Sequence, residues 1–165
     1  HIVYVMMDDL GWSSVGFNAA AGAGDYMPKT PHLDELARTG LKLQRHYVHH
    51  TCAPSRSSFF TGRLPVHVNQ VNPPVWAIGS GIPAKMMTMP SMMQRSGYRT
   101  VFVGKWHQGS SHRYMLPARR GFESSLAMLG GASNYWTQAH WLPGENVKHI
   151  DLWLDEQPAY GLNNM

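Results

Sequence analysis

The sequence predicts an α/β fold, with a mainly parallel sheet flanked by helices. Apolar runs typical of strands alternate along the chain with short segments typical of helices. The 165 residues, 43% of them hydrophobic, supply enough apolar material for about one domain core. Charged residues are only 15% and aromatic residues reach 11%, which excludes an intrinsically disordered chain. The single cysteine excludes a disulfide framework.

The first expected strand is the continuous apolar run 2–7, which has the composition of a buried strand covered on both faces. It stops at Asp8-Asp9, and residues 16–27, rich in Gly and Ala, predict a loop. The chain begins directly in an apolar run, without an initiator Met or a lead-in. We therefore expect residues 1–165 to be a fragment of a longer protein.

A helix is expected after this loop. Thr30 can cap it, Pro31 suits its first position and Gly40 can end it, with an apolar stripe formed by Leu33, Leu36 and Ala37. Residues 41–48 predict a second strand. A short helix is expected from about Pro54 to Gly62, where glycine again occupies the terminating position.

The second half of the pattern repeats this alternation. Residues 64–85 predict a long ordered loop, and residues 90–96 predict a short helix closed by Gly97. Residues 98–103 predict the next strand, which ends at Gly104-Lys105-Trp106-His107. Ligands of open α/β sheets bind beyond the carboxyl ends of the strands, where the polar clusters of this sequence fall.

Charge is distributed unevenly along the chain. Residues 36–122 contain twelve Lys and Arg and no acidic residue, so this stretch carries +12 and the flanks carry −8. Such a run is often only a solvated face, but an acid-free stretch of this length favours an anionic ligand. Nucleic acid, phosphate, sulfate and anionic lipid all fit that description. No apolar run approaches the roughly 20 residues of a membrane-spanning helix.

Asp8 and Asp9 are the first candidate site. Two adjacent carboxylates repel each other unless a cation lies between them, and Ca²⁺ or Mg²⁺ would supply that cation. The alternative is a turn and helix-cap role. Two carboxylates fall short of the six to eight oxygens that Ca²⁺ takes, so further ligands must come from elsewhere.

Cys52 and Arg56 form the second candidate site. Cys52 lies at the start of an expected helix and Arg56 about one turn later, and both the helix N-terminus and a guanidinium favour a thiolate. A thiol nucleophile with a histidine base is one interpretation, and an inert buried cysteine is the alternative.

Lys105 and His107 form the third candidate site. Alternate residues of a strand point to one side, so this pair is expected to face a common anion at the sheet edge, with His107 as a general acid or base. The alternative is a surface pair without a catalytic role. Residues 112–113 and 134–136 are further candidates for lining a pocket, although core packing is the favoured role for Tyr135 and Trp136.

Taken together, these clusters resemble the sulfatase family. Cys52-Ala53-Pro54-Ser55-Arg56 followed by Thr61-Gly62 is similar to the sulfatase signature, and Asp8-Asp9 and Gly104-Lys105-Trp106-His107 resemble two further motifs of the family. Residues 30–34 match the helix between them. Residues 116–122 are most similar to the arylsulfatase B type, which acts on sulfated N-acetylgalactosamine in glycosaminoglycans.

The resemblance implies an alkaline-phosphatase-like sulfatase fold and a hydrolase that cleaves sulfate esters. It also implies that residues 1–165 are the amino-terminal part of a sulfatase catalytic domain. It implies that Cys52 is converted to formylglycine by a formylglycine-generating enzyme, and that the hydrated aldehyde attacks sulfur. The second hydroxyl of that diol then expels sulfate. It further implies that Asp8 and Asp9, with the modified Cys52, hold Ca²⁺. In this mechanism Arg56 would steady the diol, and Lys105 would bridge the diol and the sulfate. His107 would assist the elimination of sulfate.

The resemblance also sets expectations about partners and departures. The substrate would be an aryl or glycosaminoglycan sulfate rather than nucleic acid, and the family is usually lysosomal, secreted or periplasmic. Two residues depart from the family pattern. Phe60 stands where the family usually has Leu or Met, and Gln108 stands where Leu is common. The second metal pair of the family is not among these residues, so the 165-residue piece alone is expected to be inactive.

Two other functions fit parts of the sequence. A non-catalytic anion-binding module for sulfated glycan or nucleic acid would need only the basic segment, and its binding would survive loss of Cys52. A related metal-dependent phosphoesterase would normally carry Ser or Thr at that position.

Overall fold

The computed structural model describes residues 1–19, 24, 28–69, 71–72, 74, 77–141 and 146–163. The chain divides into two compact units, His1–Tyr47 and Val48–Met165. The first unit contains the 3₁₀ helices η1 (Trp12–Ser14) and η2 (Gly16–Asn18) and the α-helix α1 (Pro31–Thr39). None of the helices in the described ranges combines the length and the apolar character needed to cross a bilayer.

Helix α1 has the ends that the sequence predicts, with Thr30 before it and Gly40 after it. The Thr30 hydroxyl serves another purpose than capping: it accepts a hydrogen bond from the Gly16 N–H at 2.8 Å and donates one to the Asp34 carboxylate at 2.9 Å. The same carboxylate accepts a bond from the Phe17 N–H at 3.0 Å. A Cβ at Gly16 would lie 2.4 Å from Asp34 Oδ2, so glycine permits this close approach.

Two of the expected strands are wrong. Residues 2–7 and 41–48 have no strand structure, and the side chains of Val3 and Leu41 are each 88% exposed. An apolar pattern favours a strand, but a strand forms only where a neighbouring backbone pairs with it. The loop expected at residues 16–27 begins with η2. Residues 20–23 and 25–27 of this loop lie outside the described ranges.

The second unit begins with α2 (Cys52–Thr61), whose start lies two residues before the expected one. Four of its five buried positions, Ala53, Arg56, Ser57 and Phe60, recur at the spacing of one helix face, and the fifth is Pro54 in the first turn. Gly62 ends the helix in the left-handed conformation, with φ 66°, as the sequence predicts. In the expected loop that follows, η4 (Pro65–His67) is the first element, and residues 70, 73, 75 and 76 lie outside the described ranges.

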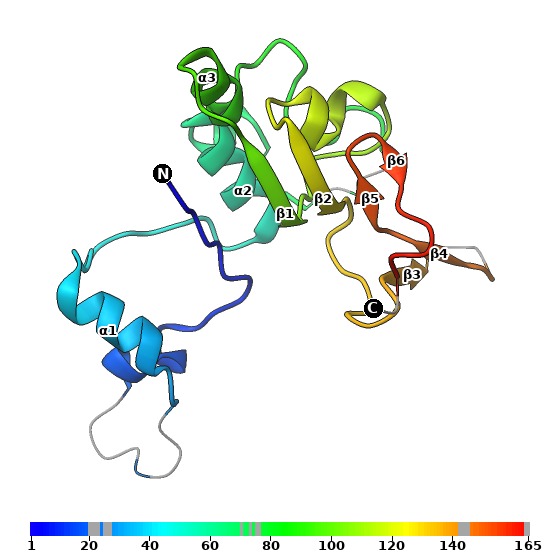
Figure 1. Cartoon of the computed structure of the whole chain (residues 1–165). Coiled ribbons are helices and arrows are strands. Elements are labelled where there is room, and N and C mark those ends of the chain that lie inside the picture. The colour runs from blue at the N-terminus through cyan, green and yellow to red at the C-terminus, as the bar shows by residue number, and fades with distance from the viewer. Residues whose placement is uncertain are drawn as a thin grey trace. The chain divides into compact units, whose positions relative to one another are not determined.

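Helix α3 (Met89–Arg95) confirms the next expected helix. It lies with α2 beside the strand that follows it in the chain (Figure 1). Strand β1 (Val101–Lys105) begins three residues later than expected and includes Lys105. Two short helices, η5 (Arg113–Met115) and η6 (Pro117–Arg119), connect it to β2 (Ser124–Met128).

The main sheet of the second unit has the strand order β1-β2-β5-β6. Strands β1 and β2 are parallel, with Val101 opposite Ser124 and Lys105 opposite Met128. Strands β5 (Trp153–Leu154) and β6 (Gln157–Pro158) add antiparallel pairs, and β3 (Ala139–Trp141) and β4 (Lys148–Ile150) form a separate antiparallel hairpin. The α/β class is confirmed, and the sheet is mixed.

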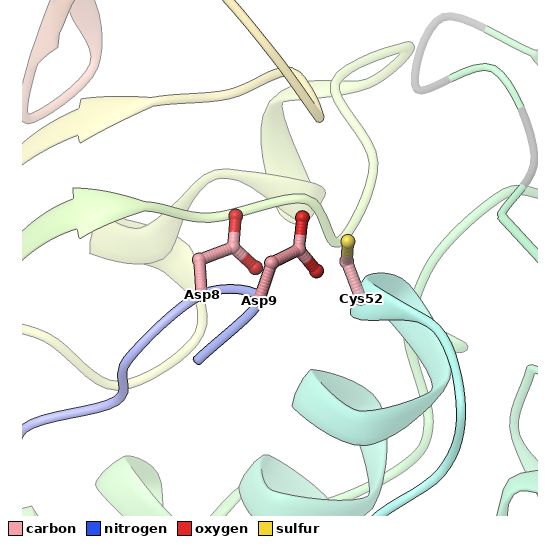
Figure 2. Close-up of side chains that lie close together, drawn as sticks. All are labelled: Asp8, Asp9 and Cys52. Atoms are coloured by element: carbon pink, nitrogen blue, oxygen red, sulfur yellow. The ribbon is translucent and has the colours of Figure 1, made fainter. Parts of the chain in front are cut away.

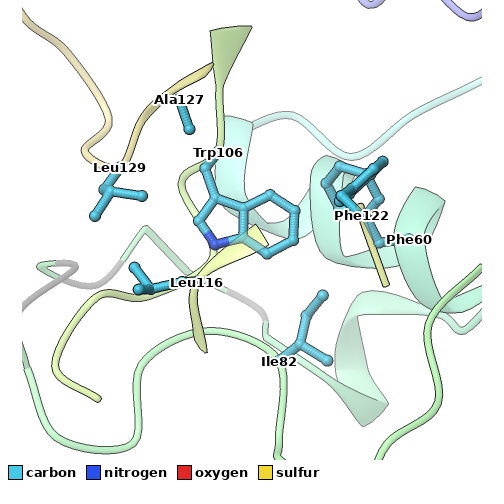
Figure 3. Close-up of a cluster of buried hydrophobic side chains, with 7 residues drawn as sticks. All are labelled: Phe60, Ile82, Trp106, Leu116, Phe122, Ala127 and Leu129. Carbon is cyan, nitrogen blue, oxygen red and sulfur yellow. The ribbon is translucent and has the colours of Figure 1, made fainter. Parts of the chain in front are cut away.

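Trp106 lies at the centre of the hydrophobic core of this unit (Figure 3). Its side chain is fully buried, and its ring centroid lies 4.9 Å from that of Phe60 on α2 and 5.5 Å from that of Phe102 on β1. The indole N–H donates to the Met115 carbonyl at 2.9 Å. The remaining members of the cluster are Ile82, Leu116, Phe122, Ala127 and Leu129. The core therefore holds the residue between Lys105 and His107 in place.

Candidate active site

The six residues singled out from the sequence belong to both units. Asp8 and Asp9 lie in the first unit, and the other four, Cys52, Arg56, Lys105 and His107, lie in the second. Figure 2 shows Asp8 and Asp9 as neighbours on the segment that precedes η1, and Cys52 as the first residue of α2.

Asp8 and Asp9 form a turn with exposed side chains. Asp9 has φ 55°, a left-handed conformation that Asp adopts more readily than most residues. Adjacent carboxylates supply the hard oxygen donors that Ca²⁺ prefers, so the donor chemistry fits such an ion. The pair provides only part of a calcium coordination shell.

Cys52 is half-buried at the first position of α2, and its thiol is not in a disulfide. The surrounding backbone is fixed by side chains: the Ala53 N–H donates to Asn72 Oδ1 at 2.8 Å, and the Ser55 hydroxyl lies within hydrogen-bond distance of the Thr51 carbonyl at 2.8 Å. Cys52 therefore lies at an ordered helix end with its side chain partly accessible.

Arg56 connects α2 to the end of β1. Its side chain is only 5% exposed, and its Nη1 donates a hydrogen bond to the Lys105 carbonyl. Because Cys52 and Arg56 are four residues apart on one helix, they lie on the same side of α2. Cys52, Arg56 and the Lys105 backbone are therefore parts of one locally ordered structure.

Lys105 and His107 are placed by Trp106, which lies between them in the sequence and is anchored in the core. Lys105 is the last residue of β1 and half-buried, whereas His107 lies beyond the strand and is 8% exposed. His107 has φ 52°, so the backbone turns there and strand alternation does not describe the pair. His107 therefore lies outside the strand, and the expectation that Lys105 and His107 face a common anion stays a prediction.

The backbone and ring of His107 lie against the segment that follows β2. The His107 N–H donates to the Leu129 carbonyl at 3.2 Å. A Cβ at Gly131 would lie 2.6 Å from His107 Cε1, so the imidazole packs directly on the glycine backbone. Glycine at position 131 thus leaves the space that the histidine ring occupies.

Gln108 ties the same segment to the first turn of α2. Its side chain is 1% exposed, and its Nε2 donates to the Ala53 carbonyl at 2.9 Å. A Cβ at Gly81 would lie 1.9 Å from the Gln108 carbonyl oxygen, so the neighbouring loop approaches closely. Gln108 is a buried connection between α2 and the residues after β1.

Part of the basic segment has a structural role. Arg113 and Arg119 both pair with Glu156, at 2.9 and 2.8 Å. Arg120 donates to three backbone carbonyls, those of Pro83, Ala84 and Met86, and burial lowers the pKa of its guanidinium. These three cations are engaged by the protein, so the excess of positive charge overstates what an anion would meet.

One buried carboxylate, Asp151, has no signal in the sequence. Its oxygens accept hydrogen bonds from the N–H groups of Leu129 at 2.9 Å and Gly130 at 2.6 Å. Burial raises the pKa of Asp151, while these two hydrogen bonds and the charge of His140 oppose the rise. A single Asp outside any motif has no sequence signal, because its role depends on the backbone that folds around it.

The favoured core role for Tyr135 and Trp136 is wrong, since their side chains are 91% and 77% exposed. They follow Asn134 in a turn, where Asn134 Oδ1 accepts bonds from the N–H groups of Trp136 and Thr137. Asn134 also lines a hollow of about 320 Å³, together with Ala132, Ser133, Thr137, Ala139, His140 and Lys148.

Comparisons with known proteins agree on one family. A family model described as Sulfatase matches residues 1–157. Arylsulfatase J of Mus musculus is 32% identical over 165 residues, which cover 99% of this chain and 26% of that protein. N-acetylgalactosamine-6-sulfatase of Homo sapiens is 32% identical over 133 residues, covering 74% of this chain and 24% of the relative.

Solved structures give the same result. The crystal structure of Ps i-CgsB in complex with k-i-k-neocarrahexaose matches with a TM-score of 0.69 and 35% identity, over 79% of this chain and 28% of that one. PsFucS1 sulfatase from Pseudoalteromonas sp. matches with a TM-score of 0.60 and 31% identity, over 81% and 26% of the two chains. The chain thus spans about a quarter of the length of these proteins.

Proposed function

Because the chain belongs to the sulfatase family, with the α/β, alkaline-phosphatase-like fold of its relatives, we propose that residues 1–165 are the amino-terminal part of a sulfuric ester hydrolase. The observation that carries the proposal is the hydrogen bond from Arg56 to the Lys105 carbonyl. It joins the helix that begins at Cys52 to the strand end that carries Lys105 and His107. A binding module for anions has no need of a cysteine in this position.

The net reaction consumes one water, breaks the bond between sulfur and the alcohol oxygen, and releases the alcohol, inorganic sulfate and a proton. The formylglycine form of Cys52 would supply the oxygen nucleophile, and Ca²⁺ held by Asp8, Asp9 and the modified Cys52 would supply positive charge to the sulfate oxygens. A formylglycine-generating enzyme is the proposed maturation partner.

The protein's own side chains have complementary roles in this proposal. Arg56, fixed by its bond to the Lys105 carbonyl, holds positive charge beside the first turn of α2, where the nucleophile lies. The Lys105 ammonium binds a sulfate oxygen and opposes the negative charge that develops as the ester bond breaks. An imidazole nitrogen of His107 takes a proton from the nucleophile side during release of sulfate.

The substrate class that we propose is a sulfated glycan. Two observations support it: relatives include N-acetylgalactosamine-6-sulfatases, and one matched structure holds an oligosaccharide named neocarrahexaose. Turnover of sulfated galactosamine and galactose oligosaccharides by the full-length protein, compared with turnover of 4-nitrophenyl sulfate, tests this class. A protein that cleaves only the aryl ester would contradict the glycan assignment and leave the ester hydrolase intact.

The decisive experiment for the reaction is mass spectrometry of the peptide that contains Cys52, from full-length protein made in a host with the converting enzyme. We expect an aldehyde in place of the thiol, and loss of 4-nitrophenyl sulfate hydrolysis in Cys52→Ala. Finding only thiol, with activity intact in Cys52→Ala, would exclude the mechanism. Faster hydrolysis of 4-nitrophenyl phosphate than of the sulfate would favour a phosphoesterase instead.

The same assay tests whether turnover depends on Ca²⁺ and whether the isolated 165-residue chain is active. Chelation should abolish turnover, Ca²⁺ should restore it, and Asp8→Asn and Asp9→Asn should weaken the restoration. The isolated 165-residue chain should show no turnover, since two aspartates and the modified Cys52 give an incomplete calcium shell. Robust turnover by the isolated chain would show that no further ligands are needed.

A further inference from the structure

The Asp151 carboxylate holds the turn that follows β2. Asp151 is 8% exposed, and each of its two oxygens accepts a separate backbone hydrogen bond, from Leu129 at 2.9 Å and from Gly130 at 2.6 Å. A carboxylate is the one side chain of this length that accepts two such bonds without presenting a donor. The turn is therefore matched to Asp at position 151.

The same turn supports His107. The Leu129 carbonyl accepts the His107 N–H at 3.2 Å, and the Gly131 backbone lies against the imidazole. His107 has φ 52°, a conformation that a non-glycine residue keeps only where its surroundings hold it. Leu129 and Gly130 thus bond to Asp151, while Leu129 accepts the His107 N–H and Gly131 packs against the His107 ring.

We propose that Asp151 is a positioning residue that acts through the Leu129–Gly131 turn to fix the imidazole of His107. This inference rests on the proposed function, because it assumes that His107 moves a proton in sulfate ester hydrolysis. Asp151 has no role toward the substrate itself. Its effect is to keep the ring in the orientation that proton transfer requires, where a displacement of about 1 Å costs on the order of a hundredfold in rate.

The chain offers a matched control at the other end of β2. The Asp155 carboxylate accepts the Ser125 N–H at 2.7 Å, and the Asp155 N–H donates to the Ser125 carbonyl at 2.8 Å. Asp155 therefore also fixes the backbone at an end of β2. It does so at the start of the strand, whereas His107 contacts the residues after its end.

The test compares Asp151→Asn with Asp155→Asn in the full-length enzyme with 4-nitrophenyl sulfate. In Asp151→Asn the amide keeps one acceptor and turns an NH₂ toward the second backbone N–H, so the turn shifts. In Asp155→Asn the amide oxygen still accepts the one Ser125 N–H, but as a neutral acceptor, which weakens that bond. In Asp151→Asn we expect kcat to fall about tenfold or more, with KM changed by less than about threefold. In Asp155→Asn we expect a lower melting temperature and a kcat like that of the wild type.

Gly130→Ala provides a second perturbation with the charge of Asp151 intact. A Cβ at Gly130 would lie 2.6 Å from Asp151 Oδ2, so alanine displaces the carboxylate from the turn. This variant should show the same selective loss of kcat, and it replaces Asp151→Asn if that protein does not fold. Combining Asp151→Asn with Gly131→Ala, which moves the ring directly, should cost less than the product of the two single effects.

The outcomes separate this inference from the proposed function. If His107→Ala leaves turnover unchanged, the proposed role of His107 is wrong and the inference falls with it. If His107→Ala abolishes turnover but Asp151→Asn and Gly130→Ala reduce kcat no more than Asp155→Asn does, only the inference is overturned.

Discussion

Arg56 and Lys105 are 49 residues apart in the sequence, and the buried guanidinium of Arg56 donates a hydrogen bond to the backbone carbonyl of Lys105. This bond links the helix that begins with Cys52 to the strand that ends with Lys105. The sequence signature around Cys52 and the Gly-Lys-Trp-His motif therefore meet through a side chain of one and the backbone of the other. Arg56 therefore has a structural role in addition to its proposed electrostatic role in catalysis.

Replacing Arg56 by Lys should separate charge from geometry. Lysine keeps the positive charge but lacks the planar guanidinium. The guanidinium can bond to the Lys105 carbonyl and at the same time hold charge beside α2. We expect kcat to fall by about a hundredfold and the free energy of unfolding to fall by about 1–2 kcal/mol. Steady-state kinetics and denaturant unfolding measure both. Arg38→Lys, on the exposed face of α1, should change neither, and a fully active Arg56→Lys would contradict the assignment.

Gln108 allows a different test, because its two polar atoms are in unequal situations. Its Nε2 is bonded to the Ala53 carbonyl, whereas its buried Oε1 has no hydrogen-bond donor within the described part of the chain. Gln108→Leu removes both atoms at similar volume, and we expect a free energy of unfolding within about 1 kcal/mol of the wild type or above it. Gln108→Ala leaves a cavity and should cost about 2 kcal/mol or more. Equal losses in both variants would show that the Nε2 bond dominates.

The helices were predictable from sequence because their end signals are local. Pro31 and Gly40 bound α1, and Gly62 ends α2, by conformational preferences that do not depend on the rest of the chain. The strands were less predictable. Residues 2–7 have the apolar composition of a strand without pairing, while β2 is paired but reads Ser-Ser-Leu-Ala-Met, with no β-branched or aromatic residue.

The candidate site divides in the same way. The sequence identifies Lys105 and His107 as neighbours at a strand end, and it misses the left-handed backbone of His107 because that conformation is stabilised by non-local contacts. Asp151 was missed entirely, since its two hydrogen bonds depend on where the chain returns beside β2. Motifs locate reactive groups, and the residues that orient them are found only in the fold.

Gly62 should be sensitive to substitution for conformational reasons alone. Its φ is 66°, and a Cβ built there would meet nothing within 4 Å. Gly62→Ala should therefore lower the free energy of unfolding by about 1 kcal/mol, through the left-handed backbone and not through a clash. Gly62→Asn should cost less, because Asn adopts this conformation more readily. Chemical denaturation of the three proteins measures the order, and an equal cost for Ala and Asn would point to a steric cause.

Asp151 should also make stability depend on pH in a defined direction. Burial raises its pKa above the ordinary value of 3.8, so the folded protein binds this proton more tightly than the unfolded chain does. The stabilisation from this group is complete below the unfolded pKa and is lost as the pH rises through the folded pKa.

Asp151→Asn removes this titration. The stability of the wild type relative to the variant should therefore decrease as the pH rises above about 4, the ordinary pKa of Asp. Denaturant unfolding of both proteins across this range gives the difference directly, and groups that titrate in both proteins cancel. A difference that increases with pH would show that the hydrogen bonds from Leu129 and Gly130 outweigh the burial of the carboxylate.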